Sequence, residues 1–77
     1  MERDLVEYIA KSLVDDPASV SVAVVEGDKS TILELRVAPD DIGKVIGKHG
    51  RIAKAMRTII SASAGASERR VVLEILD

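Results

Sequence analysis

The sequence predicts an α+β fold in which a three-stranded mixed sheet carries three helices on one face. The apolar residues change their spacing along the chain in the order helix, strand, strand, helix, helix, strand. The two consecutive strands flank a glycine turn, which is typical of an antiparallel hairpin. The two helical stretches before the last strand form a crossover, and a crossover favours parallel pairing of the strands it connects. With 77 residues and 47% apolar content, residues 1–77 are expected to form a single domain.

The first half of the chain is expected to form a helix and then the hairpin. Apolar residues recur at helical spacing over residues 3–14, and this helix should stop before Pro17 because the residue before a proline avoids helical angles. Residues 19–38 then alternate between apolar and polar side chains on both sides of a turn at residues 27–29. They are predicted to be two antiparallel strands.

The second half is expected to contain two further helices and the last strand. Acidic residues begin a short helix over residues 40–46, where carboxylates complement the positive end of a helix, and Gly47 is placed to end it as a C-terminal cap. A second helix is predicted over residues 51–64, and a strand rich in β-branched residues over residues 71–76. The side of the second helix that is expected to be buried holds Ile52, Ala55, Met56, Ile59 and Ile60.

Positive charge is concentrated in one short segment of an acidic protein. The chain has a net charge of -2 and an isoelectric point of about 5.3, yet residues 42–57 contain five Lys or Arg residues and no acid. Such a segment attracts a local anion, and it predicts a narrow binding site and not a broad surface that grips a duplex. Tyr8 is the single aromatic residue, so bases would have to rest on aliphatic side chains.

Several classes of function find no support in the composition. The chain contains no cysteine, which excludes disulfides, thiolate catalysis and zinc fingers and fits a reducing compartment. Its amino terminus is charged, and no apolar run reaches the roughly 18 residues that span a bilayer, so we expect a cytoplasmic protein with no membrane partner. His49 is the only histidine, and no nucleophile–base pair or metal-ligand set accompanies it. We therefore expect no enzyme activity, no metal, no cofactor and no small-molecule substrate.

A G-x-x-G turn, Gly47-Lys48-His49-Gly50, lies inside the basic segment. Glycines lack a Cβ atom, so the backbone of a nucleic acid can lie directly against such a turn. The turn also opens the second predicted helix, whose first N–H groups form an anion site. Taken alone, a G-x-x-G sequence more often marks a simple connection between two helices, but the basic pair between the glycines and the flanking isoleucines favour nucleic acid.

The run from Val45 to Ile52, V-I-G-K-H-G-R-I, resembles the signature of the K-homology (KH) domain, in which an I-G-x-x-G-x-x-I core joins two helices. The extra helix and strand before this core resemble the type II arrangement. The chain is similar to the small stand-alone bacterial KH proteins of the KhpA family in three respects. These are its length, residues 37–41 and the ending at residues 69–72. The resemblance implies binding of single-stranded RNA, a role as an RNA chaperone or post-transcriptional regulator, and a larger KH-containing partner (KhpB-like). It also implies a link to cell-wall growth and cell shape.

The resemblance assigns roles to the residues around the turn, because the G-x-x-G loop of a KH domain clamps about four nucleotides of single-stranded backbone. The predicted RNA-binding residues are Gly47, Lys48, His49, Gly50, Arg51, Lys44, Lys54, Ile46 and Ile52. Bases would rest in a groove lined by Ile42, Val45 and Ile46 from the first helix of the core and by Ile52, Ala53 and Met56 from the second, with Arg69 and Arg70 at the opposite rim.

Alternatives to these assignments stay open on the sequence alone. Helical spacing places Ile46, Ile52 and Met56 in the core more readily than in a groove. Lys54 and Arg57 fit a solvated helix face as well as a contact with RNA. The whole fold would also serve as a protein-interaction or dimerisation module with weak or no intrinsic RNA binding. Exposed sheet edges make the chain itself a further expected partner.

Overall fold

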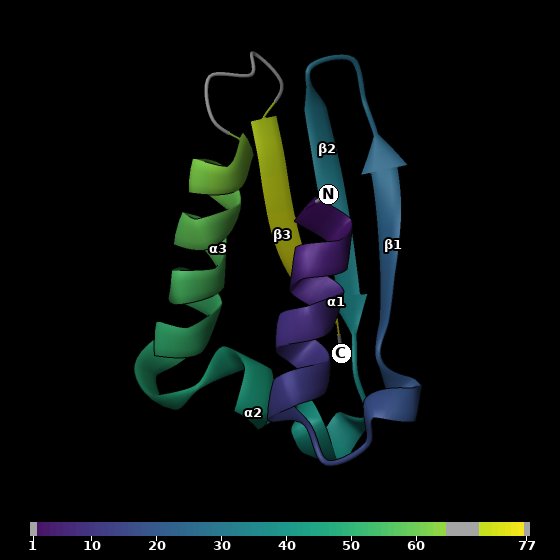
Figure 1. Ribbon diagram of the computed structural model, residues 1–77, viewed down its shortest axis with the longest axis vertical. Coiled ribbons are helices and arrows are strands. Elements are labelled where there is room, and N and C mark those ends of the chain that lie inside the picture. Colours follow the sequence, from purple (N-terminus) through teal and green to yellow (C-terminus); the bar gives the residue numbers. More distant parts are fainter. Residues whose placement is uncertain (1, 65–69, 77) are drawn as a thin grey trace.

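The computed structural model describes residues 2–64 and 70–76, and it contains the predicted elements in the predicted order (Figure 1). The helices and strands are α1 (Glu2–Leu13), β1 (Ser21–Glu26), β2 (Ser30–Arg36), α2 (Ile42–Ile46), α3 (Arg51–Ala64) and β3 (Arg70–Leu76). Single turns of 3-10 helix occur at Pro17–Ser19, Pro39–Asp41 and Lys48–Gly50. Within the described ranges, no helix is long and apolar enough to cross a membrane.

The three strands form one mixed sheet in the order β1-β2-β3. β1 pairs with β2 in antiparallel orientation, from Ser21 opposite Arg36 to Glu26 opposite Thr31. β2 pairs with β3 in parallel orientation, as a crossover through α2 and α3 requires. The predicted α+β class is confirmed, and the order of elements is consistent with the type II KH fold.

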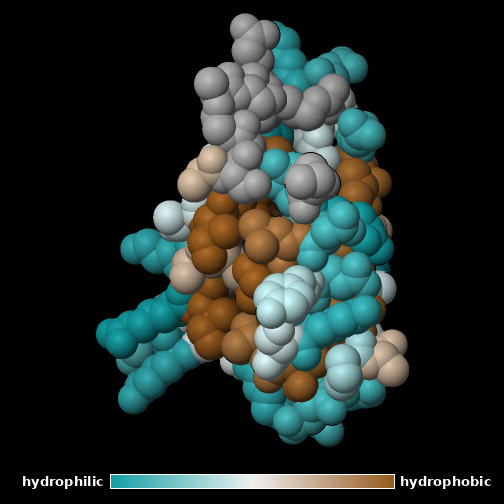
Figure 2. Space-filling model, viewed as in Figure 1, coloured by the Kyte–Doolittle hydropathy of each residue, from teal (hydrophilic) through white to brown (hydrophobic). Residues whose placement is uncertain are grey.

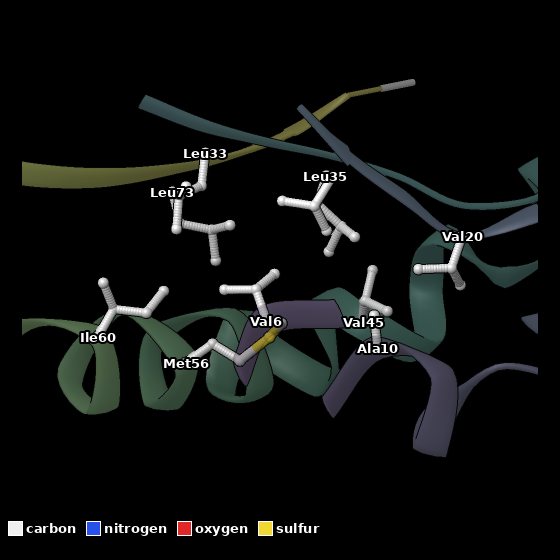
Figure 3. Close-up of a cluster of buried hydrophobic side chains, with 10 residues drawn as sticks. Val6, Ala10, Val20, Leu33, Leu35, Val45, Met56, Ile60 and Leu73 are labelled. Atoms are coloured by element: carbon white, nitrogen blue, oxygen red, sulfur yellow. The ribbon is translucent and has the colours of Figure 1, made fainter. Parts of the chain in front are cut away.

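The core lies between the sheet and the helices, which cover the same face of the sheet (Figure 3). Side chains alternate along a strand, so only every second residue reaches this core. Leu33 and Leu35 of β2 point toward Val6 of α1 and Met56 of α3 in Figure 3, and all four are buried. The helices are thereby fixed against one face of the sheet, and the short α2 is fixed with them through the fully buried Val45.

The buried side of α3 differs from the predicted one. Ala53, Met56 and Ile60 are buried, whereas Ala55 is exposed and the Ile59 side chain is 45% exposed. Each residue turns the helix by about 100°, so Ala55 and Ile59 lie well to one side of the line through the three buried positions. The apolar arc of α3 is wider than the surface that the rest of the described chain covers. The predictions of buried Ala55 and Ile59 were therefore wrong.

Candidate nucleic-acid interface

Gly47 ends α2 in a backbone conformation that is open almost only to glycine. Its φ is 78° and its ψ is 169°, and its N–H donates to the carbonyl oxygen of Gly43 at 2.9 Å. A Cβ atom on Gly47 would lie 2.6 Å from Cγ1 of Ile52. The predicted C-terminal cap is confirmed, and glycine is required here both by the backbone angles and by the closeness of Ile52.

Residues 48–50 form one tight turn that leads directly into α3. His49 has a φ of 60° and a ψ of 24°, the left-handed region that a minority of non-glycine residues adopt. Gly50 also has a positive φ, 72°, but a Cβ atom there would meet nothing within 4 Å. The N–H of Gly50 donates to the Gly47 carbonyl oxygen at 3.0 Å. The chain therefore passes from α2 to α3 in the four residues Gly47–Gly50, and the tip of the turn stays exposed.

The backbone N–H groups that are available to an anion are not the ones that were expected at the first residues of α3. The N–H groups of Gly50 and Arg51 are used inside the turn, by the carbonyl oxygens of Gly47 and Lys48. The N–H groups of Lys48 and His49 make no hydrogen bond with any other described residue. The free donors thus lie on the turn itself and not on the first residue of α3, although the positive end of the 14-residue α3 still faces the turn.

The basic residues and the histidine around the turn have exposed and unengaged side chains. Lys48, His49, Arg51 and Lys54 make no side-chain hydrogen bond or ion pair with residues 2–64 or 70–76. Figure 2 shows hydrophilic side chains projecting outward beside the lower part of α3, where that helix begins. The structure brings these four predicted site residues together on one exposed edge, where Lys48, Arg51 and Lys54 direct positive charge to solvent.

Lys44 is held by carboxylates of the protein, unlike the other predicted cations. Its Nζ lies 2.8 Å from Oδ2 of Asp15 and 3.0 Å from Oδ1 of Asp41. These hydrogen bonds, to Asp15 first and Asp41 second, raise the pKa of Lys44. Because both of these anions lie within the chain, the charge of Lys44 is largely balanced before any ligand arrives.

Asp41 is the buried polar residue among the described residues, with 2% of its surface exposed. Its carboxylate accepts a hydrogen bond from Lys44 and another from the N–H of Asp16 at 3.0 Å. The hydrogen bond from Lys44 is the main cause that lowers the pKa of Asp41, with backbone N–H groups of Asp16 and Asp15 adding to it against the effect of burial. Asp41 thereby ties the turn after α1 to the start of α2, the helix that leads into the G-x-x-G loop.

The predicted groove residues divide between core and surface. Val45 and Ala53 are buried in the core, so their assignment to an open groove is corrected. Met56 is also buried, which confirms the core position that helical spacing favoured for it. Ile46 is 37% exposed, and helical spacing had placed it more readily in the core. Ile52 is partly buried and packs beneath Gly47.

Arg70, the described part of the predicted opposite rim, lies away from the loop. Arg69 falls outside the described residues, and Arg70 opens β3 just after the end of α3. α3 has 14 residues and is therefore about 20 Å long. β3, which Arg70 begins, starts near the end of α3 that is opposite to the G-x-x-G loop (Figure 1). The aliphatic surface near the loop consists mainly of Ile46 with parts of Ile42 and Ile52.

Gly47→Ala is expected to destabilise the fold more than Gly50→Ala. At Gly47 the backbone angles and the short distance to Ile52 both oppose a methyl group, so we expect a loss of about 3 kcal/mol or more. At Gly50 only the positive φ opposes it, so the loss should be about 1–2 kcal/mol. Urea denaturation followed by circular dichroism measures both values. An equal loss, or a larger one at Gly50, would contradict this account of the turn.

The stability conferred by Asp41 is expected to depend on pH. A carboxyl group whose pKa is lowered by folding stabilises the protein fully above its unfolded pKa of about 4, and this contribution is lost as the pH falls through the lower folded value. Asp41→Asn should therefore reduce the free energy of unfolding at pH 7, and the difference from wild type should shrink at pH 3. Urea denaturation at both pH values tests this. A difference that stays constant would show that the charge of Asp41 is not what stabilises the fold.

Comparison with known proteins identifies the family of this chain. A family model described as KhpA/KhpB, KH domain, matches residues 3–75. An RNA-binding protein KhpA of Treponema pallidum is 58% identical over 77 residues, which cover 100% of this chain and 96% of the relative. An RNA-binding protein KhpA of Clostridium acetobutylicum is 61% identical over 74 residues, which cover 96% of this chain and 99% of the relative. No solved structure gave a significant match. Both relatives are named as RNA-binding proteins and not as enzymes, and the chain belongs to the KhpA/KhpB family of KH domains.

Proposed function

We propose that this protein binds single-stranded RNA through the loop Gly47–Gly50 and the start of α3. The observation that carries the proposal is the group of exposed, unengaged cations around a turn with free backbone donors, in a chain whose net charge is negative. Phosphate oxygens accept hydrogen bonds from such donors and are attracted by Lys48 and Arg51. The names of the relatives support RNA as the ligand.

Single-stranded RNA fits the site better than a duplex. The loop is one tight turn wide, and a KH-type clamp of this size holds about four nucleotides of backbone. Bases that are not stacked in a helix would rest on Ile46 and on the accessible parts of Ile42 and Ile52. These side chains offer apolar contact without specific hydrogen bonds, so we propose modest affinity and little sequence specificity.

The protein would act as an RNA chaperone or post-transcriptional regulator in the cytoplasm together with a larger, KhpB-like protein. The description of the family pairs KhpA with KhpB. The half-exposed Ile59 favours a protein-docking role for the flank of α3, and Figure 2 shows hydrophobic side chains reaching the surface beside this helix. An electrophoretic shift assay on unstructured RNA, with and without that partner, separates intrinsic RNA binding from binding through the partner.

The double variant Lys48→Asp/His49→Asp is expected to lose RNA binding while it stays folded. Aspartate tolerates the left-handed angles of position 49, and both side chains are exposed, so stability should change little. Two added carboxylates would repel the phosphate that the loop must hold. Circular dichroism and fluorescence titration of a labelled RNA on the same sample measure both properties.

The matched control for this experiment is Ala18→Asp/Lys29→Asp. It changes the net charge by the same amount at two exposed positions outside the loop and outside the helices and strands that flank it. RNA affinity in this control should stay within about threefold of wild type, because these exposed charges lie outside the site and are screened by salt. Unchanged RNA affinity in a folded Lys48→Asp/His49→Asp variant would refute the proposed site.

The preference for single-stranded over double-stranded RNA provides an independent prediction. The narrow cationic site and the aliphatic side chains beside it should bind an unstructured strand more tightly than a perfect duplex of the same length, because only unpaired bases can turn toward those side chains. Competition titrations against one labelled single strand give the two affinities under the same conditions. Equal or tighter binding of the duplex would contradict the proposed mode.

The salt dependence of binding should reveal which cations contact phosphate. If Lys48, Arg51 and Lys54 each neutralise one phosphate, log K should fall with log[salt] with a slope of about -2. Lys54→Gln should make this slope shallower by about 0.7, whereas Lys44→Gln should leave it nearly unchanged because Lys44 is already paired with Asp15 and Asp41. A slope near zero in wild type, or equal effects of the two variants, would contradict this assignment.

A further inference from the structure

α2 has few buried side chains to hold it in place. The helix has only five residues, Ile42–Ile46, and a helix of this length is not stable without tertiary contacts. Val45 is the α2 residue that belongs to the buried core cluster (Figure 3). Asp41 lies one helical turn before Val45 and is buried on the same side. Val45 and Asp41 are therefore the two buried points that hold α2 against the rest of the chain.

The carboxylate of Asp41 makes tertiary contacts and does not cap its own helix. Asp41 occupies the N-cap position of α2, where an aspartate usually accepts a hydrogen bond from a backbone N–H of the first turn, but no such bond is present. One oxygen, Oδ2, accepts from the N–H of Asp16 at 3.0 Å, and the other, Oδ1, accepts from Nζ of Lys44 at 3.0 Å. Asp41 thus joins α2 to the turn after α1, which lies 25 residues earlier in the chain.

A buried carboxylate gives α2 a fixed orientation more than it gives the fold stability. A charged group costs free energy to bury even when it is paired, and a well-packed apolar side chain in its place is often equally stable or more stable. Hydrogen bonds are directional, whereas apolar contacts allow a helix to slide or tilt. The two bonds of Asp41 therefore specify the angle of α2 at a point where Val45 alone would leave it free to turn.

The position of the loop after α2 depends on this angle. The side chains of Lys48 and His49 are not tied to any other described residue, and the N–H of Gly50 bonds inside the loop. The loop is therefore placed by the two helices that it joins. α3 is a 14-residue helix with at least three buried side chains, so α2 is the less firmly held of the two.

We propose that Asp41 is a positioning residue for RNA binding: it holds α2, and with it the loop, at the angle at which the free N–H groups of Lys48 and His49 meet a phosphate. Hydrogen bonds weaken steeply when a donor turns away from its acceptor, so a small tilt of α2 would weaken both bonds. Asp41 is buried and does not touch the RNA itself. Its role in binding rests on the proposed function of the loop.

Asp41→Asn tests this role, with Asp15→Asn as the matched control. Each substitution removes one negative charge and one carboxylate partner of Lys44, so both change the electrostatics of the chain alike. The Asp15 side chain is 83% exposed, and an exposed ion pair contributes little to structure. Asp41→Asn should weaken the binding of a labelled, unstructured RNA about tenfold, roughly the worth of one hydrogen bond to a phosphate. Asp15→Asn should stay within about twofold of wild type.

Two further measurements separate positioning from a direct contact with RNA and from a general loss of stability. No phosphate contact is removed, so the slope of log K against log[salt] should be the same in Asp41→Asn and in wild type. NMR relaxation dispersion of the free Asp41→Asn protein should show exchange at the amides of Lys48 and His49, but not at Leu33 of β2, which lies in the core.

Circular dichroism establishes that the variants are folded. If Asp41→Asn does not fold, the double variant Asp41→Asn/Lys44→Gln takes its place with the same expectations, because it leaves neither member of the buried ion pair charged. A folded variant that binds RNA as tightly as wild type, or more tightly, would overturn the proposal. An equal loss of affinity in Asp15→Asn, or loop amides without exchange, would overturn it as well.

The variant Lys48→Asp/His49→Asp shows which of the two proposals has failed. If it loses RNA binding while Asp41→Asn keeps it, the loop is the RNA site and only the positioning role of Asp41 is refuted. If neither variant changes the affinity, the proposed RNA site is refuted together with that role.

Discussion

The close approach of Gly47 to Ile52 determines the geometry of the loop and of the two helices that it joins. A side chain on Gly47 would overlap Ile52, and the positive φ of Gly47 turns the chain away from α2 at once. Because the connection takes only the four residues Gly47–Gly50, α3 begins close to the end of α2, and its core positions Ala53 and Met56 are buried. The cations of the loop are exposed for the same reason, since the tight turn leaves no room to bury them.

The electrostatics of the chain separate cations that support the structure from cations that can serve a ligand. Lys44 lies among acidic side chains and stabilises the start of α2 through Asp41, a buried carboxylate that would be costly without its partner. Lys48 and Arg51 have no anion within hydrogen-bond distance among the described residues. A protein that is acidic as a whole can therefore attract RNA at one place, and its negative charge elsewhere disfavours non-specific contact with phosphates.

Features of the fold that depend on residues close together in the sequence could be predicted from the sequence. The end of α2 at Gly47 was predictable because the glycine and the helical spacing before it lie within a few residues. The ion pairs of Lys44 were missed because Asp15 lies far from it in sequence, although the spacing of Asp41 and Lys44, three residues apart in one helical turn, was a signal for part of them. The exposure of Ile59 was missed for another reason, because periodicity gives the apolar side of a helix but not the width of the surface that covers it.

We propose that RNA contacts the turn between Gly47 and Gly50 and the start of α3, and not the open face of the sheet. Amide chemical shifts of the isotope-labelled chain, recorded by NMR during titration with an unstructured RNA of about eight nucleotides, about two KH footprints, test it residue by residue. We expect the largest shifts at Lys48, His49 and Arg51, and small shifts at Glu34 and Glu74 on the uncovered face of the sheet. Large shifts at those two glutamates together with unshifted loop amides would contradict it.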